Sequence, residues 1–281
     1  IEYVILDEGW SVNKAADLMQ VVPEIDLPLL CQYAESKGVG IVLWAGYAAM
    51  DKDMERVCKH YSEMGVKGFK VDFMDRDDQE AVRFYWRMAE TAAKYRLFVD
   101  FHGAYKPTGL NRTWPNVLNF EGVYGLENTK WDGSTDFVTH ELILPFTRMV
   151  AGPMDYTQGA MVCVPREEFR ADWYHPIAQG TRDRQLAEYV IFDGPFSMLC
   201  DSPTNYEKYP ELTRLIASIP TTWDETRVLE GRVGEYIVVV RRKGDTWYYA
   251  GINNWTERQV VVGSETITMG PGDGFIRIVN E

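Results

Sequence analysis

The sequence predicts an α/β fold, a (β/α)8 TIM-type barrel followed by a small C-terminal antiparallel β domain. Short, nearly continuous apolar runs recur along most of the chain, and each is followed by a helical stretch. Continuous apolar runs are typical of strands that are covered on both faces in a parallel sheet. Near residue 223 the pattern changes to short runs separated by Gly, Pro and Asn turn signals. We therefore place the barrel at residues 1–222 and the β domain at residues 223–281.

The barrel strands are predicted from the apolar runs that end in polar or glycine residues. The stronger runs are Tyr3–Leu6, Gly40–Ala45, Gly68–Phe73, Leu97–Phe101 and Val117–Phe120, and the weaker ones are Gly152–Tyr156 and Phe196–Leu199. An eight-stranded barrel needs one strand more than these runs provide. Because the chain enters an apolar run directly at Ile1, we expect the first strand to be missing upstream.

Three helices are predicted between these strands, at Pro28–Lys37, Met54–Met64 and Asp77–Tyr95. The first two end next to Gly38 and Gly65, and glycine after the last turn is a helix-stop signal. We assign Asp75 and Asp77 to capping the third helix. The strands predicted for the β domain are Tyr236–Arg241, Thr246–Ile252, Gln259–Val262 and Phe275–Val279.

Composition excludes several classes of function. The formal net charge of −13 argues against a nucleic-acid partner, because phosphate binding requires clustered Lys and Arg. The sequence contains no stretch of about 20 apolar residues, so no membrane-spanning helix is predicted. The 4 cysteines are far apart without CxxC pairs, so neither a zinc site nor a disulfide framework is indicated. We expect buried free thiols.

Acidic residues follow nearly every predicted strand, and chemistry in such barrels takes place at the carboxyl ends of the strands. These residues include Asp7, Glu8, Asp72, Glu121 and Asp155. Converging carboxylates without a Ser–His or Cys–His pair indicate glycoside hydrolysis by two carboxyl groups. A metal-dependent hydrolase or lyase is the alternative that the same residues allow.

Two pairs of residues carry the chemistry in this hypothesis. Alternation along a strand places Lys70 and Asp72 on one face, where a lysine would keep a nucleophilic carboxylate ionised. A structural ion pair is the other interpretation. Glu121 and Glu127 lie in one loop and could supply a general acid and ligands for Ca²⁺, or be ordinary loop acids.

Longer motifs carry a resemblance to a known family. The runs Tyr3–Trp10 and Gly68–Asp75 resemble the α-galactosidase-like barrels. Together with Asn119–Glu127 and Gly152–Thr157, they most closely resemble glycoside hydrolase family 97. The resemblance covers essentially the whole chain. The Lys-x-Asp element at Lys70 and Asp72 alone is shared by several α-glycosidase families. The loop Asn119–Glu127 with its two glutamates narrows the resemblance to family 97.

The resemblance implies calcium-dependent exo-hydrolysis of α-galactosides or α-glucosides. Family members that retain the anomeric configuration carry a nucleophile where Asp72 lies. Inverting members lack this Asp and place a Glu base elsewhere, one such place being occupied here by Gly103. The resemblance therefore implies a retaining α-galactosidase with Glu127 as acid/base and Glu121 with Glu127 as calcium ligands. A retaining enzyme has its two carboxyl groups about 5–5.5 Å apart, against about 6.5–9.5 Å for inversion.

Similarity to related barrels also implies a substrate site. Asp7, Glu8 and Lys70 would hold sugar hydroxyls, with Trp44 as a wall of the site. We add His102, although packing or hydrogen bonding is the commoner role of such a histidine. The resemblance further implies an N-terminal β-sandwich domain in the full-length protein, one calcium ligand from outside the barrel, and a bacterial periplasmic or secreted location. An α-glucosidase on the same site and a non-catalytic carbohydrate-binding barrel are the alternatives.

Overall fold

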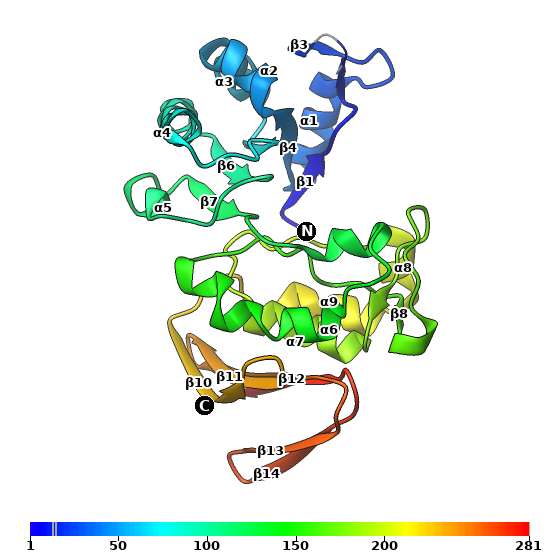
Figure 1. Ribbon diagram of the computed structural model, residues 1–281. Coiled ribbons are helices and arrows are strands. Elements are labelled where there is room, and N and C mark those ends of the chain that lie inside the picture. The colour runs from blue at the N-terminus through cyan, green and yellow to red at the C-terminus, as the bar shows by residue number, and fades with distance from the viewer. Residues whose placement is uncertain (13, 15, 281) are drawn as a thin grey trace. The chain divides into compact units, whose positions relative to one another are not determined.

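The computed structural model describes residues 1–12, 14 and 16–280, which form two compact units, Ile1–Gly122 and Val123–Glu281 (Figure 1). The domain boundary at residues 222/223 stays a prediction. Among the described residues, no helix combines the length and the apolar character needed to cross a membrane.

The first unit is built on a parallel sheet with the strand order β1-β4-β5-β6-β7. Its strands are β1 (Tyr3–Leu6), β4 (Gly40–Gly46), β5 (Gly68–Asp72), β6 (Phe98–Phe101) and β7 (Val117–Phe120). All five match the stronger predicted runs to within one residue at either end, and the parallel arrangement confirms this part of the predicted α/β fold. A short antiparallel pair, β2 (Ser11–Val12) and β3 (Asp17–Val21), was not predicted.

At least one helix lies between each two successive strands of the parallel sheet (Figure 1). They are α1 (Leu27–Ser36), α2 (Tyr47–Lys52), α3 (Met54–Met64), α4 (Gln79–Lys94) and α5 (Leu110–Thr113). Helix α3 ends at Gly65, whose φ of 105° is the left-handed conformation that glycine adopts without strain. The core between sheet and helices contains fully buried side chains such as Phe69, Phe84 and Phe101.

The predicted caps of α4 were wrong. Asp78 is the N-cap, and its carboxylate accepts hydrogen bonds from the amides of Glu80 and Ala81. Asp75 instead has a φ of 48° and donates its own amide to the Gly103 carbonyl over 2.7 Å. Helix α4 begins at Gln79, so the residue immediately before it is the one whose side chain can reach the free amides of the first turn.

The second unit begins with short helical turns and ends in β structure. Its helices are α6 (Phe137–Glu141), α7 (Arg182–Ile191), α8 (Pro203–Lys208) and α9 (Pro210–Ser218), with the 3-10 turns η2 (Leu126–Lys130), η3 (Leu144–Phe146), η4 (Arg148–Ala151) and η5 (Arg166–Glu168). Its strands are β8 (Cys163–Val164), β9 (Ala178–Gln179), β10 (Glu225–Arg232), β11 (Tyr236–Lys243), β12 (Thr246–Asn253), β13 (Arg258–Val262), β14 (Glu265–Met269) and β15 (Gly274–Asn280).

The C-terminal β structure confirms the predicted change of pattern. Strands β10-β11-β12-β15 form an antiparallel sheet, and β13 pairs with β14. The sequence predicted four of these strands and missed β10 and β14. Most of β10 is exposed, so its sequence lacks the apolar alternation that reveals a half-buried strand.

The two weaker barrel strands were wrong, since neither segment forms a strand in the structure as described. Met154 and Tyr156 are buried, as the apolar run suggested. Pro153 has no amide to donate, and Met154 instead donates to the Asp193 carbonyl over 2.7 Å. The segment Phe196–Leu199 is only partly buried. At Gly152–Tyr156, burial therefore produced the apolar pattern without a sheet partner.

A buried charged cluster holds the second unit together. The Arg184 guanidinium donates to the Glu141 carboxylate over 2.6 Å and to the carbonyls of Val138 and Asn253, each over 2.7 Å. Asn253 belongs to β12, so one side chain links α6, α7 and the C-terminal sheet. Glu188 is also fully buried, and its burial and the neighbouring Glu141 raise its pKa well above the usual range.

All four cysteines are free thiols, which agrees with the predicted absence of a disulfide framework. Cys31 and Cys58 are buried as expected, Cys163 is half-buried, and Cys200 is exposed, which corrects the expectation for the last of them.

Candidate active site

Polar residues on neighbouring strands form two rows across the sheet of the first unit. Residues that pair in register on adjacent strands share a face of the sheet. The first row, fixed by this pairing, consists of Trp44, Lys70, Asp100 and Asn119. The second row lies two residues further along the chain, at the carboxyl ends of the strands, and consists of Asp72, His102 and Glu121. Most of the predicted site residues belong to these rows.

Asp72 is the last residue of β5, and the groups around it fix the orientation of its carboxylate. The Trp44 indole Nε1 donates to Oδ2 over 3.0 Å, and the Phe73 amide donates to Oδ1 over 2.7 Å. Phe73 has a φ of 65°, a left-handed conformation that costs a residue with a side chain about 1–2 kcal/mol. Such strain is typical of functional sites that the surrounding structure holds in place.

Trp44 is itself held rigidly. It is buried in β4, and its carbonyl accepts a hydrogen bond from the Trp10 indole over 2.8 Å. The Phe73 ring packs edge-on against it, with the ring centroids 5.6 Å apart. The sequence proposed Trp44 as a wall, and the structure shows it as a donor to Asp72. Trp10 and Phe73 were missed as supporting residues, although both lie within the quoted motifs.

Lys70 pairs with a carboxylate that follows β1. Its Nζ lies 3.0 Å from Asp7 Oδ2, and the lysine side chain is only 13% exposed, whereas that of Asp7 is 62% exposed. The Glu8 amide donates to the other oxygen of Asp7 over 3.0 Å. The sequence predicted Lys70 and Asp72 on one face but did not predict the pairing of Lys70 with Asp7. The exposed Asp7 and Glu8 are accessible to a polar ligand.

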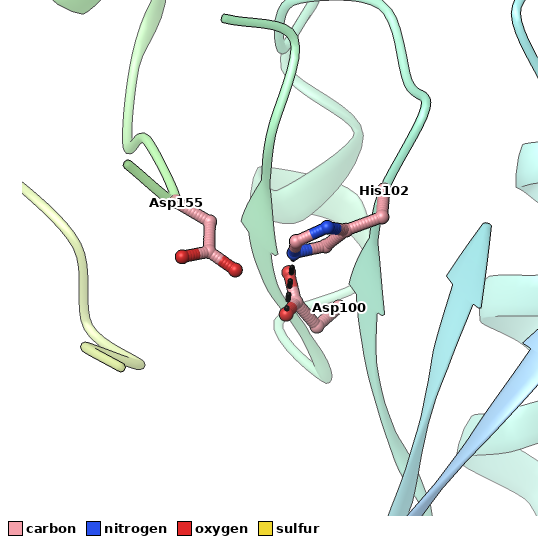
Figure 2. A group of neighbouring side chains, drawn as sticks. All are labelled: Asp100, His102 and Asp155. Carbon is pink, nitrogen blue, oxygen red and sulfur yellow. Dashed lines mark ion pairs between the residues drawn. The ribbon is translucent and has the colours of Figure 1, made fainter. Parts of the chain in front are cut away.

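His102 lies between two carboxylates. Figure 2 shows its ring beside Asp100, with Nε2 3.5 Å from Oδ2, and its Nδ1 lies 3.8 Å from Glu121 Oε2. Asp100 is completely buried, and among the described residues neither of its oxygens has a hydrogen-bond partner. A buried carboxyl group requires a polar partner, and the His102 ring lies within ion-pair distance of it. Figure 2 also draws Asp155, which is a buried residue of the second unit.

Gly103 connects the two ends of the second row. Its amide donates to Glu121 Oε2 over 2.6 Å, and its carbonyl accepts from the Asp75 amide. A Cβ atom at this position would lie 3.0 Å from Asp72 Oδ1. Gly103 therefore binds a predicted calcium ligand through its amide and leaves no room for a side chain beside the predicted nucleophile.

Glu127 lies in the first turn of η2 in the second unit, where its side chain is exposed. Hydrogen bonds from Asn128 to the Gly125 carbonyl and from Thr129 to the Leu126 carbonyl stabilise this turn. Because Asp72 and Glu127 belong to different units, the separation of their carboxyl groups stays a prediction.

Comparison with known proteins identifies the family to which the chain belongs. A family model described as glycoside hydrolase 97 matches residues 1–123, and one described as glycosyl-hydrolase 97 C-terminal, oligomerisation, matches residues 222–272. The chain is 62% identical over 263 residues to a retaining α-galactosidase of Bacteroides thetaiotaomicron, a match that covers 93% of this chain and 40% of that protein. This chain belongs to glycoside hydrolase family 97.

Two further relatives extend the comparison of this family 97 chain. It is 33% identical over 291 residues to a probable retaining α-galactosidase of Streptomyces bingchenggensis. This match covers 98% of this chain and 43% of that protein. It therefore spans less than half the length of both curated relatives. A family 97 enzyme variant from Pseudoalteromonas sp. strain K8, solved with panose, has the same fold, with a TM-score of 0.87 at 24% identity, covering 99% of this chain and 53% of that chain. The predicted (β/α)8 barrel with an antiparallel C-terminal domain is thus confirmed as a fold, here represented by part of the barrel.

Proposed function

We propose that this protein is a calcium-dependent, retaining exo-α-galactosidase. The observation that carries the proposal is the Asp72 carboxylate, held by the Trp44 indole and the Phe73 amide at the end of a barrel strand. The small Gly103 beside it and the 62% identity to a retaining α-galactosidase support the same activity. The whole protein's activity and substrate rest on this proposal.

In the proposed mechanism, Asp72 is the nucleophile. Its carboxylate attacks the anomeric carbon while Glu127 gives a proton to the leaving oxygen, so the glycosidic bond breaks and a galactosyl ester forms on Asp72. Glu127 then takes a proton from water, which attacks the same carbon and releases Asp72. Two displacements leave galactose in the α configuration. Asp7, Glu8 and Lys70 would bind the hydroxyl groups of the galactose, with His102 supporting Glu121 at its side.

Calcium is part of the proposal. Glu121 is a suitable ligand, because Ca²⁺ prefers carboxylate and carbonyl oxygens and Gly103 already orients one Glu121 oxygen. We expect Glu121 and Glu127 to hold the ion, which would supply positive charge near the leaving group. An N-terminal β-sandwich domain, an outside calcium ligand and a periplasmic or secreted location are the further parts of the proposal, supported by the family resemblance.

The test is proton NMR of the first sugar released from an α-galactoside by the full-length protein, with calcium and then with a chelator. The α anomer appearing first, and its loss on chelation, would support Asp72 as nucleophile and a working calcium site. The β anomer appearing first would show inversion and overturn the assignment of Asp72. Asp72→Ala should abolish turnover in a folded protein, and near-normal turnover would mean that another residue is the nucleophile. A matching α-glucoside, hydrolysed faster than the galactoside, would favour the α-glucosidase alternative.

A further inference from the structure

The second unit carries an exposed pair of tryptophans that the proposed mechanism does not use. The indole rings of Trp131 and Trp173 lie 5.4 Å apart at an interplanar angle of 36°. They are 47% and 60% exposed, although large aromatic side chains are usually buried. Lys130 places its ammonium group 6.0 Å from the centre of the Trp173 ring. The pair therefore combines apolar ring faces with a charged group at its edge.

Both tryptophans are held by the loops that carry them. Asp132 accepts hydrogen bonds from the amides of Ser134 and Thr135, over 2.7 and 3.1 Å, and from both of their hydroxyl groups. The Tyr124 hydroxyl donates to the same carboxylate over 3.0 Å. These bonds fix the residue that follows Trp131.

The second loop has a similar support. Asp172 precedes Trp173 and accepts from the amides of Tyr174 and His175, each over 2.9 Å. The two loops contact each other, since a Cβ on Gly133 would lie 3.9 Å from the Ala171 Cβ. The indoles are therefore exposed but pre-organised, which lowers the entropic cost of binding a ligand.

The position of the pair along the chain connects it to the leaving group. Trp131 caps the carboxyl end of η2, and Glu127 lies in the first turn of the same element. A 3-10 helix rises about 2 Å per residue, so the two positions are roughly 8 Å apart along it. Trp131 therefore lies just over one turn of η2 from the predicted acid/base Glu127.

We propose that Trp131 and Trp173 form a carbohydrate-binding platform that receives the leaving-group sugar of an α-galactosyl oligosaccharide. This inference rests on the proposed function. Indole faces suit the C–H face of a pyranose, while Lys130 and the loop hydroxyls suit its hydroxyl edge. Two half-exposed indoles offer on the order of 200 Å², whereas a standard protein interface buries about 800 Å² on each partner. The size of the patch thus favours a sugar over a protein.

The experiment compares two substrates of the full-length enzyme. Raffinose has a sugar as its leaving group, whereas α-galactosyl fluoride releases only fluoride and cannot reach the platform. The constant kcat/KM reports the step in which the leaving group departs. We expect Trp131→Ala and Trp173→Ala each to lower kcat/KM for raffinose about tenfold, which corresponds to about 1.4 kcal/mol, and to leave α-galactosyl fluoride unaffected.

Trp86→Ala is the matched control, because Trp86 is a similarly exposed tryptophan, 45% exposed on α4. This variant should keep the wild-type kcat/KM for both raffinose and α-galactosyl fluoride. An equal loss on both substrates, accompanied by a lower melting temperature, would show that the pair packs against another part of the protein, and the inference would be wrong. Unchanged kinetics on raffinose would also overturn it. If the wild-type enzyme hydrolyses neither substrate, the proposed function fails, and the platform that depends on it is rejected with it.

Discussion

Replacing Gly103 by alanine tests how Asp72 is held in place. Gly103 has a φ of 49°, and a Cβ atom there would lie 2.8 Å from the Phe73 amide nitrogen, 2.9 Å from Asp75 Oδ1 and 3.0 Å from Asp72 Oδ1. At these distances a neighbour has to move. The Phe73 nitrogen is backbone and therefore resists, so the displacement falls partly on the Asp72 carboxylate.

The magnitude follows from two contributions. The left-handed backbone costs an alanine about 1–2 kcal/mol, and overpacking typically costs about 1–3 kcal/mol. Gly103→Ala should therefore lower the free energy of unfolding by about 2–5 kcal/mol. Misplacing a catalytic group by about 1 Å can cost 100-fold in rate, so we expect kcat/KM for an α-galactoside to fall by up to about that factor.

Gly38→Ala is the matched control, since Gly38 has a φ of 71° in the same unit, but a Cβ atom there would meet nothing within 4 Å. The free energy of unfolding of this variant should fall by only the backbone contribution of about 1–2 kcal/mol, and its kcat/KM should equal that of the wild type. Chemical unfolding and initial rates of both full-length variants measure the difference. Equal losses of stability with full activity in both would refute the idea that Gly103 positions Asp72.

Three further predictions concern hydrogen bonds and buried charge. Trp44→Phe removes the bond to Asp72 and should lower kcat/KM about 10- to 100-fold in steady-state kinetics, since bonds to charged groups contribute about 1.5–3 kcal/mol; unchanged kinetics would contradict this. Arg184→Ala leaves buried Glu141 uncompensated and should cost about 3–5 kcal/mol in urea unfolding, and a loss below about 1 kcal/mol would be inconsistent with that role. Glu188 has a raised pKa, so its contribution to stability is present below about pH 4 and is lost as the pH rises through the folded pKa. Glu188→Gln should therefore flatten the decline of stability with rising pH, and a slope equal to that of the wild type would count against a raised pKa.

The sheet of the first unit could be predicted because its strands are covered on both faces. Such strands leave uninterrupted apolar runs, as Gly40–Gly46 does with nearly every residue buried. The run that ends at Tyr156 looked similar, but its burial comes from irregular backbone that donates to the Asp193 carbonyl. A single sequence records that a segment is buried and does not record which partner its amides find.

The residues of the candidate site could be predicted from the sequence, but their contacts could not. Alternation placed Lys70 and Asp72 on one face, and the strand-end rule selected Asp7 and Glu121. The bond from Trp44 to Asp72 was beyond prediction, because it depends on the register between two strands that lie 28 positions apart in the chain. The exposed tryptophans of the second unit were equally hidden, since a Trp in a loop gives no periodic signal.

The register of the apolar core also determines the geometry of the site. Between β6 and β7 the register shifts after Val99, which pairs with Val117, so that Asp100 pairs with Asn119 and Phe101 with Phe120. Without this shift Asn119 would lie opposite Phe101, among the apolar side chains. Such irregularities re-aim side chains next to active sites. The shift brings Asn119 into the first polar row and Glu121, two residues later, into the second, while the Phe101 and Phe120 rings pack with centroids 5.6 Å apart. The register that pairs Phe101 with Phe120 is therefore also the one in which Glu121 accepts a hydrogen bond from the Gly103 amide.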